Sequence, residues 1–431
     1  MSEKNSRNDS AWKKLFEKYD ILRRIKRDGC FCISAEQIKE FREPRLMAKF
    51  DHRVNLPQIF AVNQLAILPI ARGEYVISHF DAYHEFEKND SRQIMKCSLP
   101  SHLQSLCSDS ITSEAMALNC AVASGIIADF LEEEESIFAT VVGRMSSGTF
   151  SFNINDSQSN LLRPINVNNS QIEIDAGYEG VSCLALFEAK LDLADDFLVR
   201  QLYYPFRTWQ HRVSKPVKPI FFVYSNGIFR LSEYRFEDIY NYDSLRLVKQ
   251  KNYSIEDSDI STADIQAILK NIRVVDEPEI PFPQADKFER VINICELLNN
   301  NELTRQDITE IYDFTTRQTN YYTDAAIYLG MIDKSQGDKQ TAYSLTDKGR
   351  HVLNSSYKQR QLAFCESILS HKVFNDTLSA SLQRGSVLSV KEIIEIMKQS
   401  NPYKVESEET FKRRAATIRA WTLWIISLIN E

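Results

Sequence analysis

Short apolar runs bounded by Gly, Asn and Pro fill the middle of the chain, whereas apolar positions three or four residues apart dominate its last third. The first pattern is typical of strands and the second of helices that bury one face. Asn226-Gly227, between the apolar runs 218–224 and 228–231, predicts a tight hairpin because both residues tolerate positive φ. The chain is therefore expected to be an α/β (α+β) multidomain protein, with a mixed central sheet and a helical C-terminal part.

A long helix is predicted ahead of the first central strands. Thr112 and Ser113 are hydroxyl residues suited to capping its start, Glu114 gives an acidic first turn, and the apolar pattern continues to about Leu131. Residues 138–143 and 149–154 then read as strands, with a turn over residues 143–148 that carries Arg144.

Two acidic residues and a lysine follow consecutive strand patterns. In residues 171–175 the side chains alternate, so Asp175 is expected on the face opposite Ile172 and Ile174. Residues 176–180 read as a hairpin turn. The next apolar run, 181–187, delivers Glu188 and Lys190 to a single face because they are two residues apart.

These residue types suit metal-dependent phosphodiester hydrolysis. Two neighbouring carboxylates repel each other unless a divalent cation neutralises them, and hard oxygen ligands favour Mg²⁺ or Mn²⁺. A nearby ammonium can orient the attacking water and offset charge that grows on the phosphate. A lone Glu-x-Lys is more often a solvated strand edge, but the upstream acid, the apolar run and the following helix favour the catalytic interpretation.

This arrangement resembles the PD-(D/E)XK nuclease superfamily, and particularly its type II restriction endonucleases, over roughly residues 112–235. The resemblance implies a restriction-endonuclease-like core, a mixed sheet flanked by helices. It also implies that Asp175, Glu188 and the carbonyl of Ala189 bind Mg²⁺ and that Lys190 assists the water. Ile174 stands where the proline of the family name would be, which leaves the metal ligand itself unchanged.

Two further residues take roles from the same resemblance. Gln201 lies where the second core helix of the superfamily faces the site, in a segment rich in aromatic residues. Pro205 within that segment is expected to kink or break the helix. Glu114 corresponds to an additional acid that some of these nucleases carry, although acids at a helix start more often stabilise the helix dipole.

Basic residues that suit DNA contact occur in several places. Four lie close together near the N-terminus, within a predicted α+β domain of residues 1–95, and arginine forks match phosphates and guanine edges. They are Arg42, Arg45, Lys49 and Arg53. Arg144 in its predicted turn is a further candidate for a phosphate contact. A solvated surface is the alternative for each of them.

The rest of the chain is expected to form DNA-reading or protein-docking domains. The nuclease-like domain is placed at residues 96–250, an acidic, proline-bearing linker at 251–284, and three helices followed by two strands at 285–355. That order is similar to winged-helix domains, which bind DNA or dock proteins. Its third helix would present Arg317, Gln318, Asn320 and Tyr321 to DNA. Residues 356–431 form a helical domain with Arg413 and Arg414 on an amphipathic helix.

Composition narrows the class of protein. The 431 residues are enough for several modest cores, and the net charge of −7 requires any DNA contact to come from local basic surfaces. The eight cysteines and seven histidines are scattered without the spacing of a zinc site. No apolar stretch is long enough to span a bilayer, so no membrane contact and a cytoplasmic location are expected.

The preferred hypothesis is a Mg²⁺-dependent, sequence-specific endonuclease that cuts double-stranded DNA as a type II restriction enzyme. The resemblance implies 5′-phosphate ends, a homodimer, and a cognate DNA methyltransferase as a partner. One alternative is a non-catalytic winged-helix transcription regulator on a nuclease-like scaffold. Another is a modification-dependent endonuclease, which would need an aromatic cage for a flipped base; Tyr203, Tyr204 and Trp209 are the candidates for it.

Overall fold

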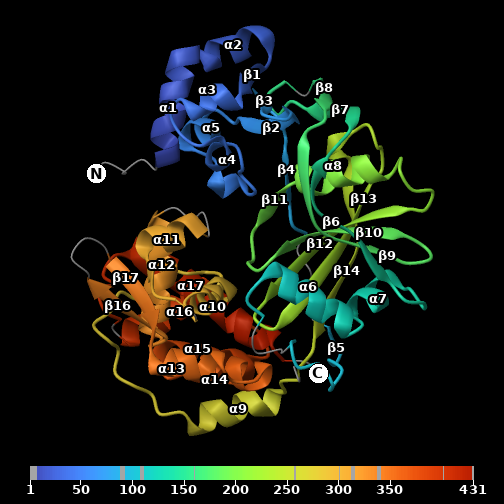
Figure 1. Cartoon of the computed structure of the whole chain (residues 1–431). Helices are drawn as coiled ribbons and strands as arrows, with labels where there is room; N and C mark the ends of the chain where they lie inside the picture. Colours follow the sequence, from blue (N-terminus) through green and yellow to red (C-terminus); the bar gives the residue numbers. More distant parts are fainter. Residues whose placement is uncertain are drawn as a thin grey trace.

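The computed structural model of the chain describes residues 7–87, 93–106, 111–159, 161–256, 259–299, 301–311, 316–336, 341–400 and 402–429. It is a mixed α/β structure with three parts that lie beside one another, namely an N-terminal part, a central part built on a sheet, and a helical C-terminal part (Figure 1). No helix in these ranges is long and apolar enough to cross a membrane.

The N-terminal part is a small α+β unit around an aromatic core. Trp12, Phe16 and Phe60 pack edge to face at its centre, with ring centroids 4.7 to 6.0 Å apart. Its elements are α1 (Arg7–Tyr19), α2 (Ile21–Asp28), β1 (Phe31–Ser34), α3 (Ala35–Lys39), α4 (Pro44–Met47), η1 (Arg53–Asn55), α5 (Gln58–Val62), β2 (Ala66–Ala71) and β3 (Glu74–Ser78).

A five-stranded sheet joins this unit to the central part of the chain. Its strand order is β1-β3-β2-β8-β7, where β7 (Thr149–Asn155) and β8 (Leu162–Asn168) come from the central part. Strands β2 and β8 run parallel and meet at Ala71 and Asn168. Leu68 and Val76 share a hydrophobic cluster with Phe152 and Val167, so one face of β2 and β3 belongs to the core of the central part, while Ile67 and Ile77 on the other face belong to the N-terminal core.

The central sheet has seven strands in the order β5-β14-β13-β12-β10-β9-β6. Strands β10 and β12 are parallel, whereas β6–β9, β9–β10 and β12–β13 are antiparallel. The bounds are β5 (Ile94–Lys96), β6 (Phe138–Ser146), β9 (Gln171–Glu179), β10 (Leu184–Lys190), β12 (Val217–Ser225), β13 (Ile228–Phe236) and β14 (Leu245–Ser254). The predicted Asn226-Gly227 hairpin joins β12 to β13, with φ of +52° and +76° at the two residues.

Helices cover both faces of this sheet. Ala185 and Phe187 of β10 pack with α6 (Glu114–Ala123) and α7 (Ile126–Leu131). Leu184 and Leu186 pack on the opposite side, with α8 (Arg200–Trp209). The helix predicted from residue 112 to residue 131 is divided at Gly125, whose φ of +77° is left-handed and ends α6. Helix α8 continues through Pro205 without the predicted break.

Two predicted turns belong to strands instead. β9 extends to Glu179, and the chain turns over residues 180–183, where the Gly180 N–H donates to the Cys183 carbonyl. Gly177 allows β9 and β6 to pack closely, since a Cβ at this position would come within 2.7 Å of the Val141 Cβ. β6 likewise continues through Arg144, which is therefore a strand residue.

A two-stranded sheet and a 3-10 helix lie beside the central sheet. β11 (Asp196–Leu198) follows the loop after β10 and pairs antiparallel with β4 (Tyr83–Glu85). The 3-10 helix η3 (Tyr242–Ser244) precedes β14. The Phe197 side chain of β11 is fully buried against Phe221 of β12, with ring centroids 4.7 Å apart. This contact fixes the loop between β10 and α8 against the sheet.

The C-terminal part begins with three helices and a small antiparallel sheet. Its elements are α10 (Phe288–Leu297), β15 (Leu303–Thr304), α11 (Arg305–Ile311), α12 (Thr316–Tyr328), β16 (Ile332–Gln336) and β17 (Thr341–Leu345), with the sheet order β15-β17-β16. The helices after them are α13 (Asp347–Leu353), α14 (Tyr357–Leu369), α15 (Lys372–Arg384), α16 (Val390–Ser400) and α17 (Glu408–Ser427). One hydrophobic cluster runs through all of these helices.

The stretch predicted as a linker contains a helix. Ser261 and Asp264 form a capping box that begins α9 (Thr262–Asn271). Ile265 and Ile268 are buried in the C-terminal hydrophobic cluster. Residues 262–271 are therefore a packed part of the structure rather than a flexible connection.

Candidate active site

A β-bulge lies beside Asp175 in strand β9. The pairing of β6 with β9 shifts here, with Val141 opposite Gly177 and Gly143 opposite Ile174. Ile174 packs on the α8 side of the sheet and Ala176 on the α6 side, so the strict alternation predicted for residues 171–175 stops at the bulge. The bulge lies at residues 175 and 176, so strand alternation alone does not fix the direction of Asp175, and its contact with β10 places it at the site.

Strand β10 and helix α8 supply the other three residues of the predicted site. The Lys190 ammonium donates to Glu188 Oε1 over 2.6 Å, and the Gln201 amide donates to the same oxygen over 2.5 Å. Glu188 and Lys190 follow Leu184 and Leu186 in alternation, which directs both toward α8. Gln201, in the first turn of α8, is thereby held against Glu188.

Asp175 connects to β10 through the backbone. Its Oδ2 accepts a hydrogen bond from the Ala189 N–H over 2.8 Å, beyond the last residues of β10 that pair with β9. The N–H and the carbonyl of a strand residue point to the same side, so the Ala189 carbonyl is directed toward Asp175 as well. The structure therefore brings Asp175, Glu188, Ala189, Lys190 and Gln201 together.

Burial makes the acids of this site difficult to ionise. It raises the pKa of Glu188 to about 7 against the opposing effect of the Lys190 charge. It also raises the pKa of Asp175 and of Glu114, which lies at the start of α6 and lines the same cavity. Burial lowers the pKa of Lys190, but the charges of Glu188 and Asp51 outweigh it, so its pKa is raised and Lys190 remains a cation.

Asp51 is a residue of the site that the sequence did not indicate. It comes from the N-terminal part, and its Oδ2 lies 4.0 Å from Lys190 Nζ. The Asp51 carbonyl accepts from the Leu198 N–H over 2.8 Å, and Asp196 accepts from the Arg53 N–H over 3.1 Å. His52 Nδ1 also contacts the Asp196 carbonyl. These contacts hold Asp51 at the site from more than a hundred residues away in the chain.

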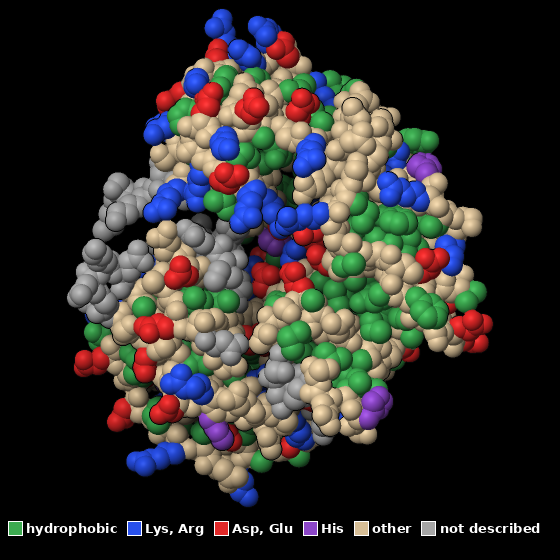
Figure 2. Space-filling model, in the orientation of Figure 1, with side chains coloured by type: hydrophobic (Ala, Val, Ile, Leu, Met, Phe, Trp, Pro, Cys, Tyr) green, Lys and Arg blue, Asp and Glu red, His purple; other side chains and the backbone are tan. Residues whose placement is uncertain are grey.

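A cavity of about 920 Å³ opens over the site between the N-terminal part and the central sheet. Asp175, Glu188, Lys190 and Gln201 lie on its sheet side. Five basic residues also line it, namely Arg45, Lys49, Arg72, Arg144 and Arg200. Figure 2 shows Lys and Arg side chains gathered along the lower edge of the N-terminal part, above a hollow in which acidic side chains are visible. The cavity thus combines an acidic base with a basic rim.

Of the basic residues predicted to bind DNA in the N-terminal and central parts, some line the cavity and others do not. Arg45 and Lys49 are exposed and line the cavity, as does Arg144, which lies 3.2 Å from Glu173. Arg53 instead contacts Asp81 and the Tyr83 carbonyl, and neither it nor Arg42 lines the cavity. Arg72 and Arg200 were not among the residues predicted to bind DNA, although Arg200 stands beside Gln201 at the start of the helix predicted to face the site.

The residues predicted to bind DNA in the C-terminal part lie on two helices outside this cavity. Arg317, Gln318, Asn320 and Tyr321 are in the first turns of α12, where the Arg317 guanidinium donates to the Tyr321 hydroxyl over 2.5 Å. On α17, Arg413 lies 3.9 Å from Glu409. Arg414 is half-buried and donates to the Gln284 side chain over 2.8 Å, which ties α17 to the segment before α10.

The aromatic residues considered for a base cage are packed inside the structure. Tyr203 and Tyr204 are fully buried beneath the five-stranded sheet, where their hydroxyls donate to the carbonyls of Ile239 and Pro69. Trp209 is partly buried against the same hydrophobic cluster. None of the three lines the cavity over the site.

The donor set fits a divalent cation in chemistry. The available ligands are carboxylate and carbonyl oxygens, which suit Mg²⁺, and the buried Gln201 Oε1 and Asp51 Oδ1 have no hydrogen-bond partner among the described residues. Burial raises the pKa of Glu188 and of Asp175 despite the nearby Lys190 ammonium, so a cation held between the two carboxylates would favour their ionised forms. Within the described ranges, however, no group of three or more His, Cys, Asp or Glu side chains is arranged to hold a metal ion.

Comparison with known families divides the chain into three matched segments. A domain of unknown function (DUF6996) matches residues 9–77, a second (DUF6997) matches residues 78–254, and a third (DUF7226) matches residues 290–430. The candidate site lies in the second segment, apart from Asp51, which belongs to the first. No curated protein and no solved structure matches the chain.

Proposed function

We propose that this protein is a Mg²⁺-dependent endonuclease that hydrolyses phosphodiester bonds in double-stranded DNA, in the manner of a type II restriction enzyme. The observation that carries the proposal is the convergence of Asp175, Glu188, Lys190 and Gln201 at the base of one cavity. A scaffold that only binds DNA has no need of this set, so its convergence favours an enzyme over a non-catalytic regulator.

The order of elements around the site supports the same proposal. Apart from α7, the β7–β8 hairpin and β11, which lie outside the seven-stranded sheet, helix α6 is followed by β6, β9 and β10, then by α8, and then by β12 parallel to β10. This is the helix, three strands, helix, strand order expected from the resemblance to PD-(D/E)XK nucleases. The three helices and small sheet from α10 to β17 are consistent with a winged helix that contacts DNA.

Each residue of the site has a role in the proposed reaction. Asp175 and Glu188, with the Ala189 carbonyl, would hold the cation, and Gln201 would keep Glu188 in place through its amide. A divalent cation bound there would supply Lewis-acid chemistry and lower the pKa of a water molecule. Lys190, a permanent cation at neutral pH, would orient the attacking water and offset the charge that develops on the phosphate.

Digestion of plasmid and phage DNA by the purified chain tests this proposal. With Mg²⁺ we expect discrete fragments that carry 5′-phosphates, and EDTA or Asp175→Asn should abolish them. Smeared products would indicate cleavage without sequence specificity. Absence of cutting on both unmodified and methylated DNA, with tight binding retained, would contradict the nuclease and favour the regulator.

The raised pKa of Glu188 predicts a pH-dependent response to Mg²⁺. The pKa of Glu188 is about 7 in the folded chain, against an ordinary value of 4.5. Without metal, Glu188 therefore contributes stability to the folded chain below pH 4.5, and this contribution is lost as the pH rises to about 7. Below pH 7 a proton competes with the cation for this carboxylate, so Mg²⁺ affinity should fall by up to about tenfold per pH unit. Thermal unfolding with and without Mg²⁺ at pH 6, 7 and 8 measures this effect.

In that experiment the Mg²⁺-induced rise in Tm should be largest at pH 8. Glu188→Gln removes the titrating group and should remove most of the Mg²⁺ response at every pH. Equal responses of the unmodified chain at pH 6 and pH 8 would show that Glu188 does not bind the cation.

The basic rim predicts a salt-dependent contribution to DNA binding. Arg45 and Arg72 are exposed, line the cavity, and have no ion pair with any residue in the described ranges. Each is placed to contact a phosphate, so Arg45→Ser with Arg72→Ser should weaken binding alike on all sequences. The slope of log K against log salt concentration should fall by about 0.9 for each arginine removed.

Fluorescence anisotropy with a labelled duplex, at several salt concentrations and with Ca²⁺ in place of Mg²⁺, measures this slope. Arg23→Ser is the matched control, because Arg23 is 86% exposed on α2 and does not line the cavity. A double variant with the same slope as Arg23→Ser would place the DNA elsewhere.

A further inference from the structure

A second cavity, of about 390 Å³, lies between the central sheet and the C-terminal helices. Its sheet side includes Arg230 and Ser232 of β13 and Gln250 of β14. Its helix side includes Glu289 of α10 and Trp424 of α17. The volume lies in the range of small-molecule sites and is too small for a duplex.

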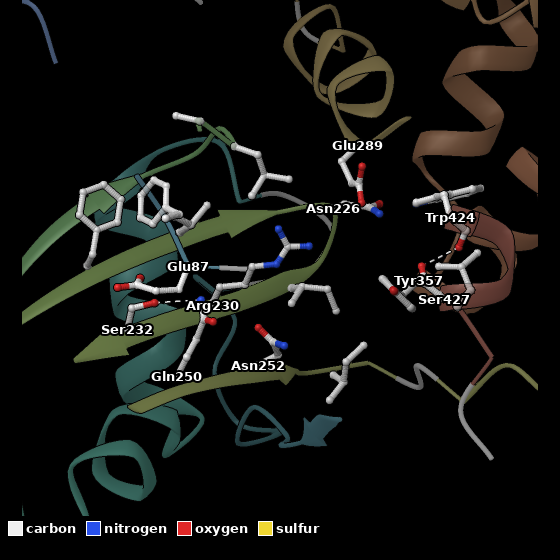
Figure 3. A pocket seen from close by; sticks show the side chains of 18 residues that line it. Glu87, Asn226, Arg230, Ser232, Gln250, Asn252, Glu289, Tyr357, Trp424 and Ser427 are labelled. Carbon is white, nitrogen blue, oxygen red and sulfur yellow. Dashed lines mark hydrogen bonds between the residues drawn. The ribbon is translucent and has the colours of Figure 1, made fainter. Parts of the chain in front are cut away.

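Arg230 is an uncompensated cation in this cavity. Its side chain is half-buried, and it has neither an ion pair nor a hydrogen bond with any residue of the described ranges. Figure 3 shows its guanidinium extended from β13 into the space between the sheet and the helices. A partly desolvated guanidinium has five donors to satisfy, and a phosphate matches its fork in two places at once.

Glu289 faces the same space from the opposite wall. Its carboxylate is also half-buried and without an ion pair among the described residues, so the cavity keeps a cation and an anion apart. A carboxylate accepts hydrogen bonds from hydroxyl or amino groups. The two residues together therefore suit one ligand that has an anionic group at one end and hydrogen-bond donors at the other.

Flat apolar surfaces complete the lining. Phe86 and Phe221 lie on the sheet side, while Tyr357 and Trp424 come from the C-terminal helices. Aromatic rings stack favourably on planar ligands, and the Ser232 hydroxyl and Gln250 amide, which hydrogen-bond to each other, can also pair with ring nitrogens. Charge, hydrogen-bond donors and aromatic side chains that line one cavity are features of a nucleotide site.

We propose that this cavity binds a free nucleoside monophosphate. Arg230 holds the phosphate, Glu289 accepts from the sugar hydroxyls, and the base lies against the aromatic walls. The proposal is separate from the nuclease site, because Arg230 and Glu289 do not line the larger cavity and none of the catalytic residues lines this one.

One loop lies between this cavity and the nuclease site. The loop after β10 borders both cavities: Leu191 and Asp192 line the larger one, and Leu193 and Ala194 line the smaller one. Asp195 in the same loop forms ion pairs with Lys287 and with Arg290, the latter at 3.2 Å. A bound nucleotide would thus contact the loop and the C-terminal helices together.

Isothermal titration of the full chain with the 5′-monophosphates of adenosine, guanosine, cytidine and uridine tests the proposal. At least one should bind more tightly than inorganic phosphate or its own nucleoside does. Arg230→Met should weaken that binding by about tenfold or more, since it removes a charge-assisted contact. Arg235→Met is the matched control, because Arg235 lies on the same strand, is 69% exposed and does not line the cavity.

A second variant and a competitor keep the result interpretable. Glu289→Gln, on the opposite wall, should also weaken binding, and both variants should keep the Tm of the unmodified chain because neither breaks an ion pair. The proposal is overturned by a failure of all four nucleotides to bind, or by binding that Arg230→Met and Arg235→Met leave equal. It is also overturned if a short single-stranded oligonucleotide displaces the nucleotide and depends on Arg230 itself, which would assign the cavity to DNA. None of these outcomes depends on DNA cleavage, so the proposal and the nuclease function can fail separately.

Discussion

Replacement of Lys190 by methionine is expected to lower the rate of DNA cleavage by roughly 10³-fold while DNA binding is retained. Methionine keeps an unbranched apolar stem of similar length but has no charge. The ammonium that it removes donates to Glu188 over 2.6 Å and lies 4.0 Å from Asp51, at the base of the basic-rimmed cavity. Single-turnover cleavage with Mg²⁺ measures the chemical step, and anisotropy with Ca²⁺ measures binding.

A loss of activity must be distinguished from a loss of folding, because Lys190 is largely buried. Lys215→Met is the matched control: Lys215 forms a comparable ion pair, 2.9 Å from Glu179, and does not line the cavity. Both variants should show similar circular dichroism spectra, but only Lys190→Met should lose cleavage. Undiminished cleavage by Lys190→Met would remove Lys190 from the mechanism.

Replacement of Trp421 by alanine is expected to destabilise the C-terminal part by about 3 to 5 kcal/mol. The Trp421 side chain is fully buried on α17, with ring centroids 4.9 Å from Phe288 and 5.1 Å from Phe374. Its indole N–H donates to the Ala285 carbonyl over 2.6 Å. Alanine would leave a cavity at the junction of α10, α15 and α17 and an unsatisfied carbonyl beside it.

Urea unfolding followed by circular dichroism measures this effect, with Leu423→Ala as the matched control. Leu423 lies on the same helix but is 38% exposed, so its truncation should change stability by about 1 kcal/mol or less. A chain of this size can unfold in more than one transition, and the loss is expected in the transition that reports the C-terminal part. Equal midpoints for the two variants would contradict the arrangement of α17.

The candidate catalytic residues could be predicted from the sequence because they are close together in the chain. Glu188 and Lys190 follow one apolar strand, Asp175 ends the preceding pattern, and Gln201 begins the next helix. Local alternation and element order are sufficient to bring such residues together. The bulge in β9 beside Asp175 was not predicted, because it depends on the pairing of β9 with β6.

Asp51 could not be predicted as a residue of the site, because long-range packing brings it there. Its position depends on contacts of residues 51–53 with residues 196–198, and no local pattern encodes which distant loop a segment will meet. Gly177 illustrates a second limit. Glycine is common in turns, which favoured a turn over residues 176–180, but here its missing side chain allows β6 to approach β9.

The C-terminal part shows the same limit at a larger scale. Periodicity identified the apolar faces of its helices, but it does not show which element covers each face. Residues 285–355 and 356–431, which the sequence suggested as two domains, bury one common hydrophobic cluster. Ile265 and Ile268 of the predicted linker join the same cluster.

The five-stranded sheet, which the first two parts of the chain share, limits how their gene segments can recombine. The matched segments meet between residues 77 and 78, at the end of β3. Strand β2 nevertheless pairs with β8, and its Ala66 and Leu68 side chains lie in a core built largely from the second segment. A recombination event at that boundary would join β2 to a foreign β8 and mismatch one half of a core with the other. The N-terminal unit and the β7–β8 hairpin are therefore expected to be inherited together. Asp51 would then stay with the candidate site that it lines.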